Sequence, residues 1–145
     1  MDLAPPRPGE VIRYAYLWMN EAKAGRREGV KIRPCAVVMA VEKRDGQMIV
    51  SVSPITHAPP VHGTRAVEIP REVKIRLGLD DERSWVACNE INDFVWPGTD
   101  ISAIPHREPS TVRYGFLPSV LFAKIKAELI ASARNQGLDR VHRDT

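Results

Sequence analysis

The stretch PCAVVMAVEKRDGQMIVSVSPI, residues 34–55, contains two β-rich runs on either side of an Asp-Gly pair. Residues 34–41 form a nearly continuous apolar run, and residues 47–55 are again rich in strand-forming side chains. Runs of this length bounded by turn residues predict strands, and Asp45-Gly46 between them is typical of a tight turn. The sequence therefore predicts a β-hairpin over this stretch.

The register of this hairpin decides which side chains meet at its open end. If the turn consists of two residues, counting outward places Cys35 opposite Thr56. Arg33 then lies opposite Ala58 and is a diagonal neighbour of Thr56 on the same face. A one-residue slip, such as that of a three-residue turn, would move Thr56 to the other face.

Outside the hairpin, the pattern predicts a mainly β fold with a helix near its C-terminal end. The helix begins near Leu117, has Pro118 in its first turn and runs towards Gly137, with an apolar stripe that packs on the sheet. Further candidate strands lie at residues 10–18, 66–69, 84–91, 93–96 and 101–104. Residues 71–79 are expected to form a helical turn, and residues 19–31 a long, mobile, basic loop.

A length of 145 residues suits one domain. Residues 1–8 are rich in proline and have no apolar period, which predicts a flexible, extended arm. Residues 9–137 are expected to form the single domain. Residues 138–145 are short and charged, and we expect them to form a solvated C-terminal tail.

The composition excludes several classes of protein. The 21 basic and 18 acidic side chains give a formal charge of +3, which permits an anionic partner without requiring one. Aromatic residues make up 6% of the chain, too few for a base-stacking sheet, so any RNA contact should depend on phosphate. No stretch approaches the roughly 20 apolar residues of a membrane helix, and no signal peptide is recognisable, so we expect a cytoplasmic protein without a membrane partner.

Motifs for metal ions and nucleotide cofactors are missing from the sequence. Cys35 and Cys88 lie in apolar segments without ligand spacing, and we expect them to be buried, reduced thiols. His57 and His62 bracket a Pro-Pro loop in which no further ligand is placed to complete a metal site. The acidic run at residues 80–82 is expected to be solvated surface. The glycines form neither a GxGxxG motif nor a P-loop, so no cofactor is expected.

Two arginines precede the hairpin in the basic loop. Arg26 and Arg27 fit two interpretations, a solvated loop or a pair of guanidinium groups that binds phosphate with Arg33. Arg33 and Thr56, taken alone, also fit an ordinary surface arginine and an ordinary strand residue.

Three short motifs follow one another in a characteristic order: Gly9-Glu10-Val11 opens a strand, GVKIRPCAVV spans residues 29–38, and Ile55-Thr56 ends the next strand. The stretch SWVACNEI at residues 84–91 and the final helix follow. Over residues 9–92 this order and spacing resemble the MazF/PemK family of toxin endoribonucleases, which belong to type II toxin–antitoxin systems.

The resemblance implies a fold and an activity. It implies a small SH3-like β-barrel of the MazF/CcdB kind, a homodimer, and a cognate antitoxin protein as partner. It also implies metal-independent cleavage of single-stranded RNA, of the mRNA interferase type, in which the substrate's own 2′-hydroxyl is the nucleophile. No cofactor is then needed.

The same resemblance assigns residues. Arg33 and Thr56 match the family's catalytic arginine and its threonine or serine. Arg33 would stabilise charge on the phosphate, and Thr56 would donate a hydrogen bond to a phosphate oxygen or bind the 2′-hydroxyl. Arg26, Arg27, Lys31 and His57 are the RNA-binding candidates, and His57 could also assist acid–base chemistry if the strand end curls. Two alternatives stay open: a non-enzymatic CcdB-like gyrase inhibitor, and an inactive RNA-binding barrel.

Overall fold

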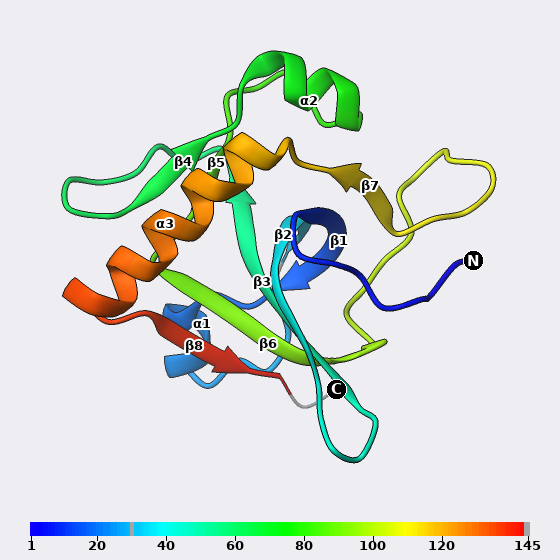
Figure 1. Ribbon diagram of the computed structural model, residues 1–145, viewed down its shortest axis with the longest axis horizontal. Helices are drawn as coiled ribbons and strands as arrows, with labels where there is room; N and C mark the ends of the chain where they lie inside the picture. The colour runs from blue at the N-terminus through cyan, green and yellow to red at the C-terminus, as the bar shows by residue number, and fades with distance from the viewer. Residues whose placement is uncertain (30, 144–145) are drawn as a thin grey trace.

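The computed structural model describes residues 1–29 and 31–143, and its strands form one mainly antiparallel sheet of eight strands with three helices (Figure 1). The elements are, in chain order, β1 (Glu10–Tyr16), α1 (Met19–Lys23), β2 (Lys31–Glu42), β3 (Met48–Thr56), β4 (Ala66–Glu68), α2 (Arg71–Leu77), β5 (Trp85–Ala87), β6 (Glu90–Trp96), β7 (Arg113–Phe116), α3 (Ser119–Asn135) and β8 (Asp139–His142). The expected mainly β fold with a C-terminal helix is confirmed.

The sheet is an open path among the described strands. Its order is β4-β5-β3-β2-β1-β7, and β6 pairs with β3 on one side and with β8 on the other. The path is not closed into a barrel, so the SH3-like barrel stays a prediction. Because β2 and β3 lie in the middle of the path, the ends of both strands are held by neighbours on either side.

The hairpin turn differs from the expected two-residue turn. The backbone N–H of Gly46 donates to the carbonyl of Lys43 at 2.9 Å, and the N–H of Lys43 donates to the carbonyl of Gln47 at 2.7 Å. The turn between these two residues therefore contains three residues, the last of which is Gly46 with a positive φ of 86°. The part of the hairpin next to the turn, where Glu42 pairs with Met48 and Met39 with Ser51, is therefore shifted by one residue from the expected register.

A second one-residue shift follows further along the hairpin. Val37 pairs with Val52 but Met39 pairs with Ser51, so the residue between Val37 and Met39 forms a β-bulge. Cys35 consequently lies opposite Pro54, and the expected pairing of Cys35 with Thr56 is wrong. The two shifts add up to two residues, an even number.

An even shift preserves the face on which each side chain lies, because side chains alternate with period two. The pairing of the two strands ends at Cys35 and Pro54, and beyond it the side chain of Arg33 reaches the end of β3, where its Nη1 donates to the carbonyl of Ile55 at 3.5 Å. The expected opposition of Arg33 to Ala58 is therefore wrong, but the expected proximity of Arg33 to Thr56 is preserved.

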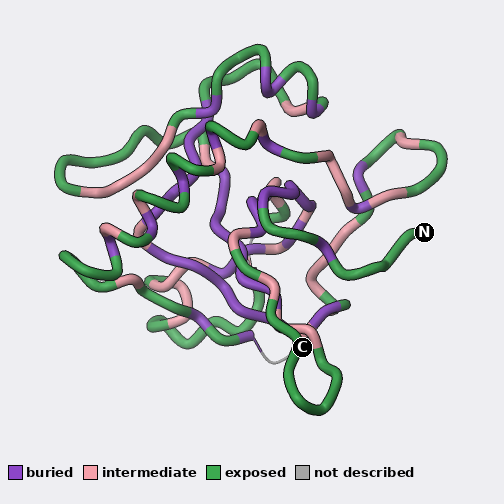
Figure 2. The backbone as a smooth tube through the Cα atoms, viewed as in Figure 1, coloured by how far each residue is buried: buried purple, intermediate pink, exposed green. Residues whose placement is uncertain are grey.

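Two apolar cores form around the sheet. One lies beneath α3 and α2 and includes the helix residues Leu121, Ile125 and Leu129, as the apolar stripe predicts. The other is built around Tyr14, which stacks on Phe94 with ring centroids 4.6 Å apart. Buried residues concentrate in the central strands, whereas the hairpin tip is exposed (Figure 2).

The C-terminal segment is a strand where a solvated tail was expected. β8 pairs in parallel with β6, and Arg143 directly after it is buried, with 2% of its side chain exposed. Its guanidinium donates to the backbone carbonyl of Ala15 at 2.9 Å and to Oδ1 of Asn92 at 3.0 Å, and it pairs with Asp100 at 3.1 Å. The charge that suggested a tail is therefore satisfied inside the fold.

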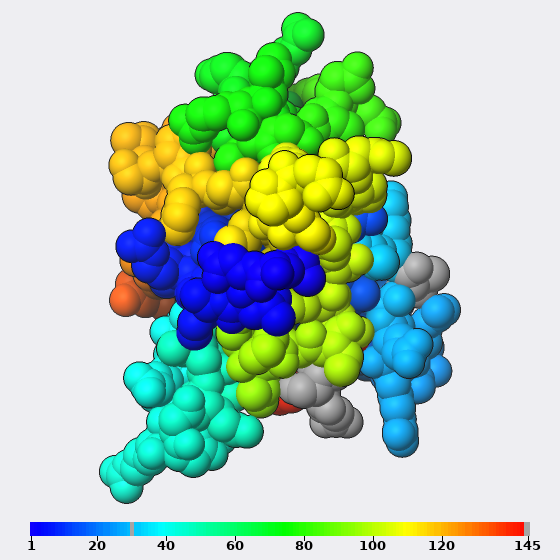
Figure 3. Space-filling view, turned by 90° about the vertical axis from the view of Figure 1, so that its right-hand side faces the viewer, coloured from blue at the N-terminus to red at the C-terminus, as the bar shows by residue number. Residues whose placement is uncertain are grey.

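The first eight residues form neither a helix nor a strand, and two backbone contacts hold them on the surface. The indole N–H of Trp96 donates to the carbonyl of Leu3 at 2.8 Å, and Arg113 donates to the carbonyl of Ala4. Figure 3 shows these residues, in dark blue, lying against the yellow loop that precedes β7.

The expected loop at residues 19–31 begins with the short helix α1, where the Glu21 carboxylate accepts a hydrogen bond from the backbone N–H of Trp18 at 3.0 Å. The strand expected at residues 84–91 is divided into β5 and the start of β6. The segment expected at residues 101–104 contributes an isolated bridge between Ile101 and Tyr14.

Among the described helices, none combines the length and apolar character needed to cross a membrane.

Both cysteines are buried and free, as expected. Burial raises the pKa of the Cys88 thiol to about 12 and raises that of Cys35 still further above its usual range. We expect neither thiol to react with a disulfide reagent such as DTNB at pH 8 in the folded protein, because reaction requires an accessible thiolate. Absorbance should report two thiols per chain only after denaturation, and rapid reaction of the native protein would contradict this burial.

Candidate active site

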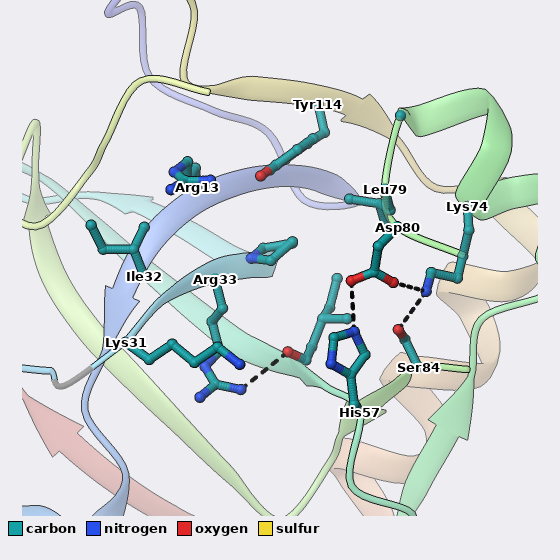
Figure 4. Close-up of a pocket in the computed structure, with 13 residues that line it drawn as sticks. Arg13, Lys31, Ile32, Arg33, His57, Lys74, Leu79, Asp80, Ser84 and Tyr114 are labelled. Atoms are coloured by element: carbon teal, nitrogen blue, oxygen red, sulfur yellow. Dashed lines mark hydrogen bonds and ion pairs between the residues drawn. The ribbon is translucent and has the colours of Figure 1, made fainter. Parts of the chain in front are cut away.

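A hollow of about 240 Å³, which we call the central pocket, opens where β1, β2 and the end of β3 meet the segment after α2 (Figure 4). Its charged lining residues are Arg13, Lys31, Arg33, Lys74 and Asp80, and His57 and Tyr114 line it as well. Four of the charged side chains are cations, and one is a carboxylate. The pocket therefore favours an anion.

Arg33 is held at the entry of β2, one residue before Pro34. Its Nη1 donates to the carbonyl of Ile55 at 3.5 Å, a long hydrogen bond, and that carbonyl belongs to the peptide group joining Ile55 to Thr56. Its guanidinium also lies over the ring of Trp18, 5.3 Å from the ring centroid. These contacts place the guanidinium beside the end of β3.

Two arginines that line the central pocket, Arg33 and Arg13, each have a buried Nε without a hydrogen-bond partner among the described residues. A buried donor without a partner is destabilising. Because these Nε atoms are enclosed, an anion in the pocket would be bound by the outer nitrogens of the two guanidinium groups.

Thr56 is the last residue of β3 and is half-buried. Its Oγ1 accepts a hydrogen bond from the backbone N–H of Ala58 at 3.1 Å. It lines a neighbouring hollow, the Thr56 pocket, together with Trp18 and Asn89. Since the Arg33 guanidinium lines the central pocket and also covers Trp18, Arg33 lies at the boundary between the two pockets.

His57 is part of a hydrogen-bonded chain that runs into the protein (Figure 4). Its Nε2 lies 2.7 Å from Oδ2 of Asp80, and Oδ1 of the same carboxylate accepts from Nζ of Lys74, also at 2.7 Å. Lys74 is 3% exposed and donates further to Oγ of Ser84 at 2.7 Å and to the carbonyl of Glu82. All three ammonium hydrogens of Lys74 thus have an acceptor.

The local sequence explains how Asp80 reaches this place. Helix α2 ends at Gly78, which has a φ of 72°, and the chain turns there so that Asp80 lies two residues later beside Lys74 of the same helix. Burial acts to raise the pKa of Asp80, but the hydrogen bonds from Lys74 and His57 outweigh it, so the pKa of this carboxyl lies below its usual value. Asp80 is therefore a stable anion that fixes the imidazole.

The structure brings some sequence candidates together and separates others. Lys31, Arg33 and His57 line the central pocket. Arg26 and Arg27 line a different hollow of about 320 Å³, beside Asp100 and Arg143, and do not line the central pocket with Arg33. They remain available only to a more distant part of an extended ligand.

Lys74 and Asp80 belong to this site although neither is among the residues that the sequence predicts for it. The acidic run that contains Asp80 is exposed, as expected, but Asp80 also pairs with Lys74 and His57. The signal was present in α2, where Val73 and Leu77 are apolar residues four positions apart and Lys74 lies beside them on the same face of the helix. A lysine on an apolar helix face indicates a buried ion pair.

His57, Asp80 and Glu82 are also the described residues whose potential ligand atoms lie close enough to hold a metal ion, within 4.8 Å of one another. However, the Lys74 ammonium already occupies one oxygen of Asp80, and a second cation beside it would be repelled. This donor set therefore fits a metal ion poorly, and we assign none to it.

The arrangement can bind a phosphate group and carry out proton transfer at its edge. Arginine side chains supply donors to the phosphate oxygens, and histidine can donate or accept a proton near neutral pH. No protein-family model matches this chain, and no curated protein matches it.

Proposed function

We propose that this protein is the toxin component of a type II toxin–antitoxin system and acts as a metal-independent endoribonuclease on single-stranded RNA. The observation that carries the proposal is that Arg33, beside the end of β3, and His57 line one cationic pocket. The resemblance to the MazF/PemK family supports it. An SH3-like barrel, a homodimer, a cognate antitoxin and a cytoplasmic location belong to the same proposal.

The central pocket would bind the phosphate at which the RNA is cut. Guanidinium groups bind phosphate oxygens through charge-assisted, often bidentate hydrogen bonds, and Arg33 and Arg13 both line this pocket. Lys31 adds a further positive charge at the rim. Negative charge on the phosphate increases when the 2′-oxygen attacks, so a fixed guanidinium stabilises the transition state more than the ground state.

Thr56 would act from the neighbouring pocket. Its oxygen already accepts the Ala58 N–H, which leaves its hydroxyl hydrogen free to donate. The expected acceptor is a phosphate oxygen or the 2′-hydroxyl of the nucleotide before the cut. This contact would help hold the 2′-oxygen in line with the bond that breaks.

The test is cleavage of a long single-stranded RNA by purified protein in excess EDTA. We expect cuts that leave a 2′,3′-cyclic phosphate and a 5′-hydroxyl, because the substrate's own hydroxyl attacks. Kinase labelling detects the 5′-hydroxyl ends, and sequencing of the ends gives the preferred site. The same cuts should be lost or strongly reduced in Arg33→Ala and Thr56→Ala.

The matched control is Arg44→Ala, which removes the same charge from the exposed hairpin turn. It should cleave like the wild type, and circular dichroism should show that every variant is folded. Failure of the folded wild-type protein to cut several diverse RNAs would refute the ribonuclease, and inhibition of DNA gyrase would then be measured next.

A further inference from the structure

The His57–Asp80–Lys74 chain has a geometry that phosphate binding alone does not require. We propose that His57 is the general acid of the reaction, which protonates the leaving 5′-oxygen, and that Asp80 and Lys74 are positioning residues that hold its ring. This inference rests on the proposed ribonuclease function and assigns the proton transfer within it.

The two nitrogens of the His57 ring have different surroundings. Nε2 lies 2.7 Å from Asp80, so in the imidazolium form it donates to that carboxylate. Nδ1 lies 3.6 Å from Oε2 of Glu82, which is longer than a hydrogen bond. Nδ1 is therefore the nitrogen whose proton is available to a ligand in the central pocket.

The His57 ring is held in place by residues of another part of the chain. The side chain of His57 is 39% exposed and follows directly after the end of β3, so its own packing does not fix it. Asp80 is fixed by Lys74, and Lys74 is buried with three acceptors. The orientation of an exposed imidazole is thus set by a buried ammonium group through one carboxylate.

Charged groups surround the ring. Asp80 and Glu82 face it from the segment after α2, with Nε2 at 2.7 Å from Asp80 and Nδ1 at 3.6 Å from Glu82. The cations of the pocket come from α2, β1 and β2, and they are Lys74, Arg13, Lys31 and Arg33. The Asp80 carboxylate therefore accepts from one ring nitrogen, while the cations are placed to bind the phosphate.

In the reaction, the 2′-oxygen forms a bond to phosphorus and the bond from phosphorus to the 5′-oxygen breaks. The proton of the 2′-hydroxyl passes to solvent, and Nδ1 of the imidazolium gives its proton to the 5′-oxygen, which leaves as a hydroxyl group. The neutral imidazole then takes up a proton from solvent. Arg33 is unsuited to this donation because its pKa exceeds about 12.

The experiment compares two versions of one RNA oligonucleotide that contains the preferred cleavage site. One has the natural 5′-oxygen at the cut, and the other has sulfur in that position, a leaving group that departs without protonation. Loss of a general acid should therefore slow only the cleavage of the oxygen substrate. We expect His57→Ala to lose about 10²–10⁴-fold on the oxygen substrate and less than about tenfold on the sulfur substrate.

Asp80→Asn should show the same selective loss with a smaller magnitude, because the ring is present but poorly held. Lys74→Arg keeps a charge for Asp80 and should be affected less than Lys74→Gln. The matched control is Asp81→Asn, which removes a neighbouring exposed carboxylate that does not line the central pocket. It should cleave both substrates like the wild type.

Two results would overturn the assignment while leaving the ribonuclease intact. In one, folded His57→Ala cleaves the oxygen substrate as fast as the wild type. In the other, it loses activity equally on both substrates, which would make His57 a binding or structural residue. A wild-type protein that cuts neither substrate would refute the proposed function itself, and the assignment with it.

Discussion

Alanine in place of Arg33 is expected to slow RNA cleavage by a factor of about 10²–10³, the loss typical of removing one group that stabilises transition-state charge. The side chain makes a single long hydrogen bond, to the Ile55 carbonyl, and stacks on Trp18. The free energy of unfolding should therefore change little. The measurement is the single-turnover rate constant on the preferred RNA site, with thermal unfolding recorded for each variant.

Arg33→Lys separates charge from geometry. Lysine keeps the positive charge, but an ammonium group cannot form the two parallel hydrogen bonds of a guanidinium or stack on Trp18 in the same way. We expect it to recover only a small part of the lost rate. Full activity of the lysine variant would show that Arg33 acts only as a positive charge, and full activity of the alanine variant would remove Arg33 from the site.

Methionine in place of Arg143 is expected to lower the free energy of unfolding by about 3–5 kcal/mol. Arg143 is buried, donates hydrogen bonds to the Ala15 carbonyl and to Asn92, and pairs with the Asp100 carboxylate. Methionine fills a similar length but donates no hydrogen bond, so these acceptors lose their partner and Asp100 becomes a poorly compensated charge. Urea denaturation should show a lower midpoint with an unchanged slope.

Arg140→Met is the matched control for this effect. Arg140 lies three residues earlier on β8, is 43% exposed and pairs with Asp93 at 3.1 Å. Asp93 is buried but keeps the hydrogen bond from Ser51 at 2.6 Å and the contact with His142 at 3.3 Å, so this variant should lose clearly less stability than Arg143→Met. An equal loss in both variants would mean that the whole strand β8, and not the buried guanidinium, is what these substitutions disturb.

Local patterns predicted the elements well, because each depends on neighbouring residues. The apolar stripe of α3 and the two strands of the hairpin have a period that is visible in the sequence itself. The C-terminal strand was missed for the opposite reason. Arg143 and its neighbours are charged, and the acceptors that permit burial, such as Asn92, lie about 50 residues away in the chain.

The candidate site was predicted in part. Arg33 and Thr56 could be placed together by counting along one hairpin, although the counting used the wrong turn. His57, Asp80 and Lys74 could not, since they come from a strand end, a turn and a helix whose contact depends on the tertiary fold. No sequence spacing predicts the contacts of Asp80 with His57 and Lys74. The position of Lys74 on the apolar face of α2 indicates only that this lysine is buried and needs a partner.

The bulge between Val37 and Met39 determines which changes in chain length this hairpin tolerates. Residues can be added to or removed from the three-residue turn while the paired strands beyond it keep their partners, so loop length is free to vary. Removing the single extra residue at the bulge would also keep the pairs, because Val37 and Met39 already face consecutive residues of β3, Val52 and Ser51. A deletion within the regularly paired part of the hairpin is different, because every residue on one side of it would shift by one position against the partner strand. Variation in length at the tip or at the bulge is therefore compatible with an intact site, whereas a deletion between paired residues is not.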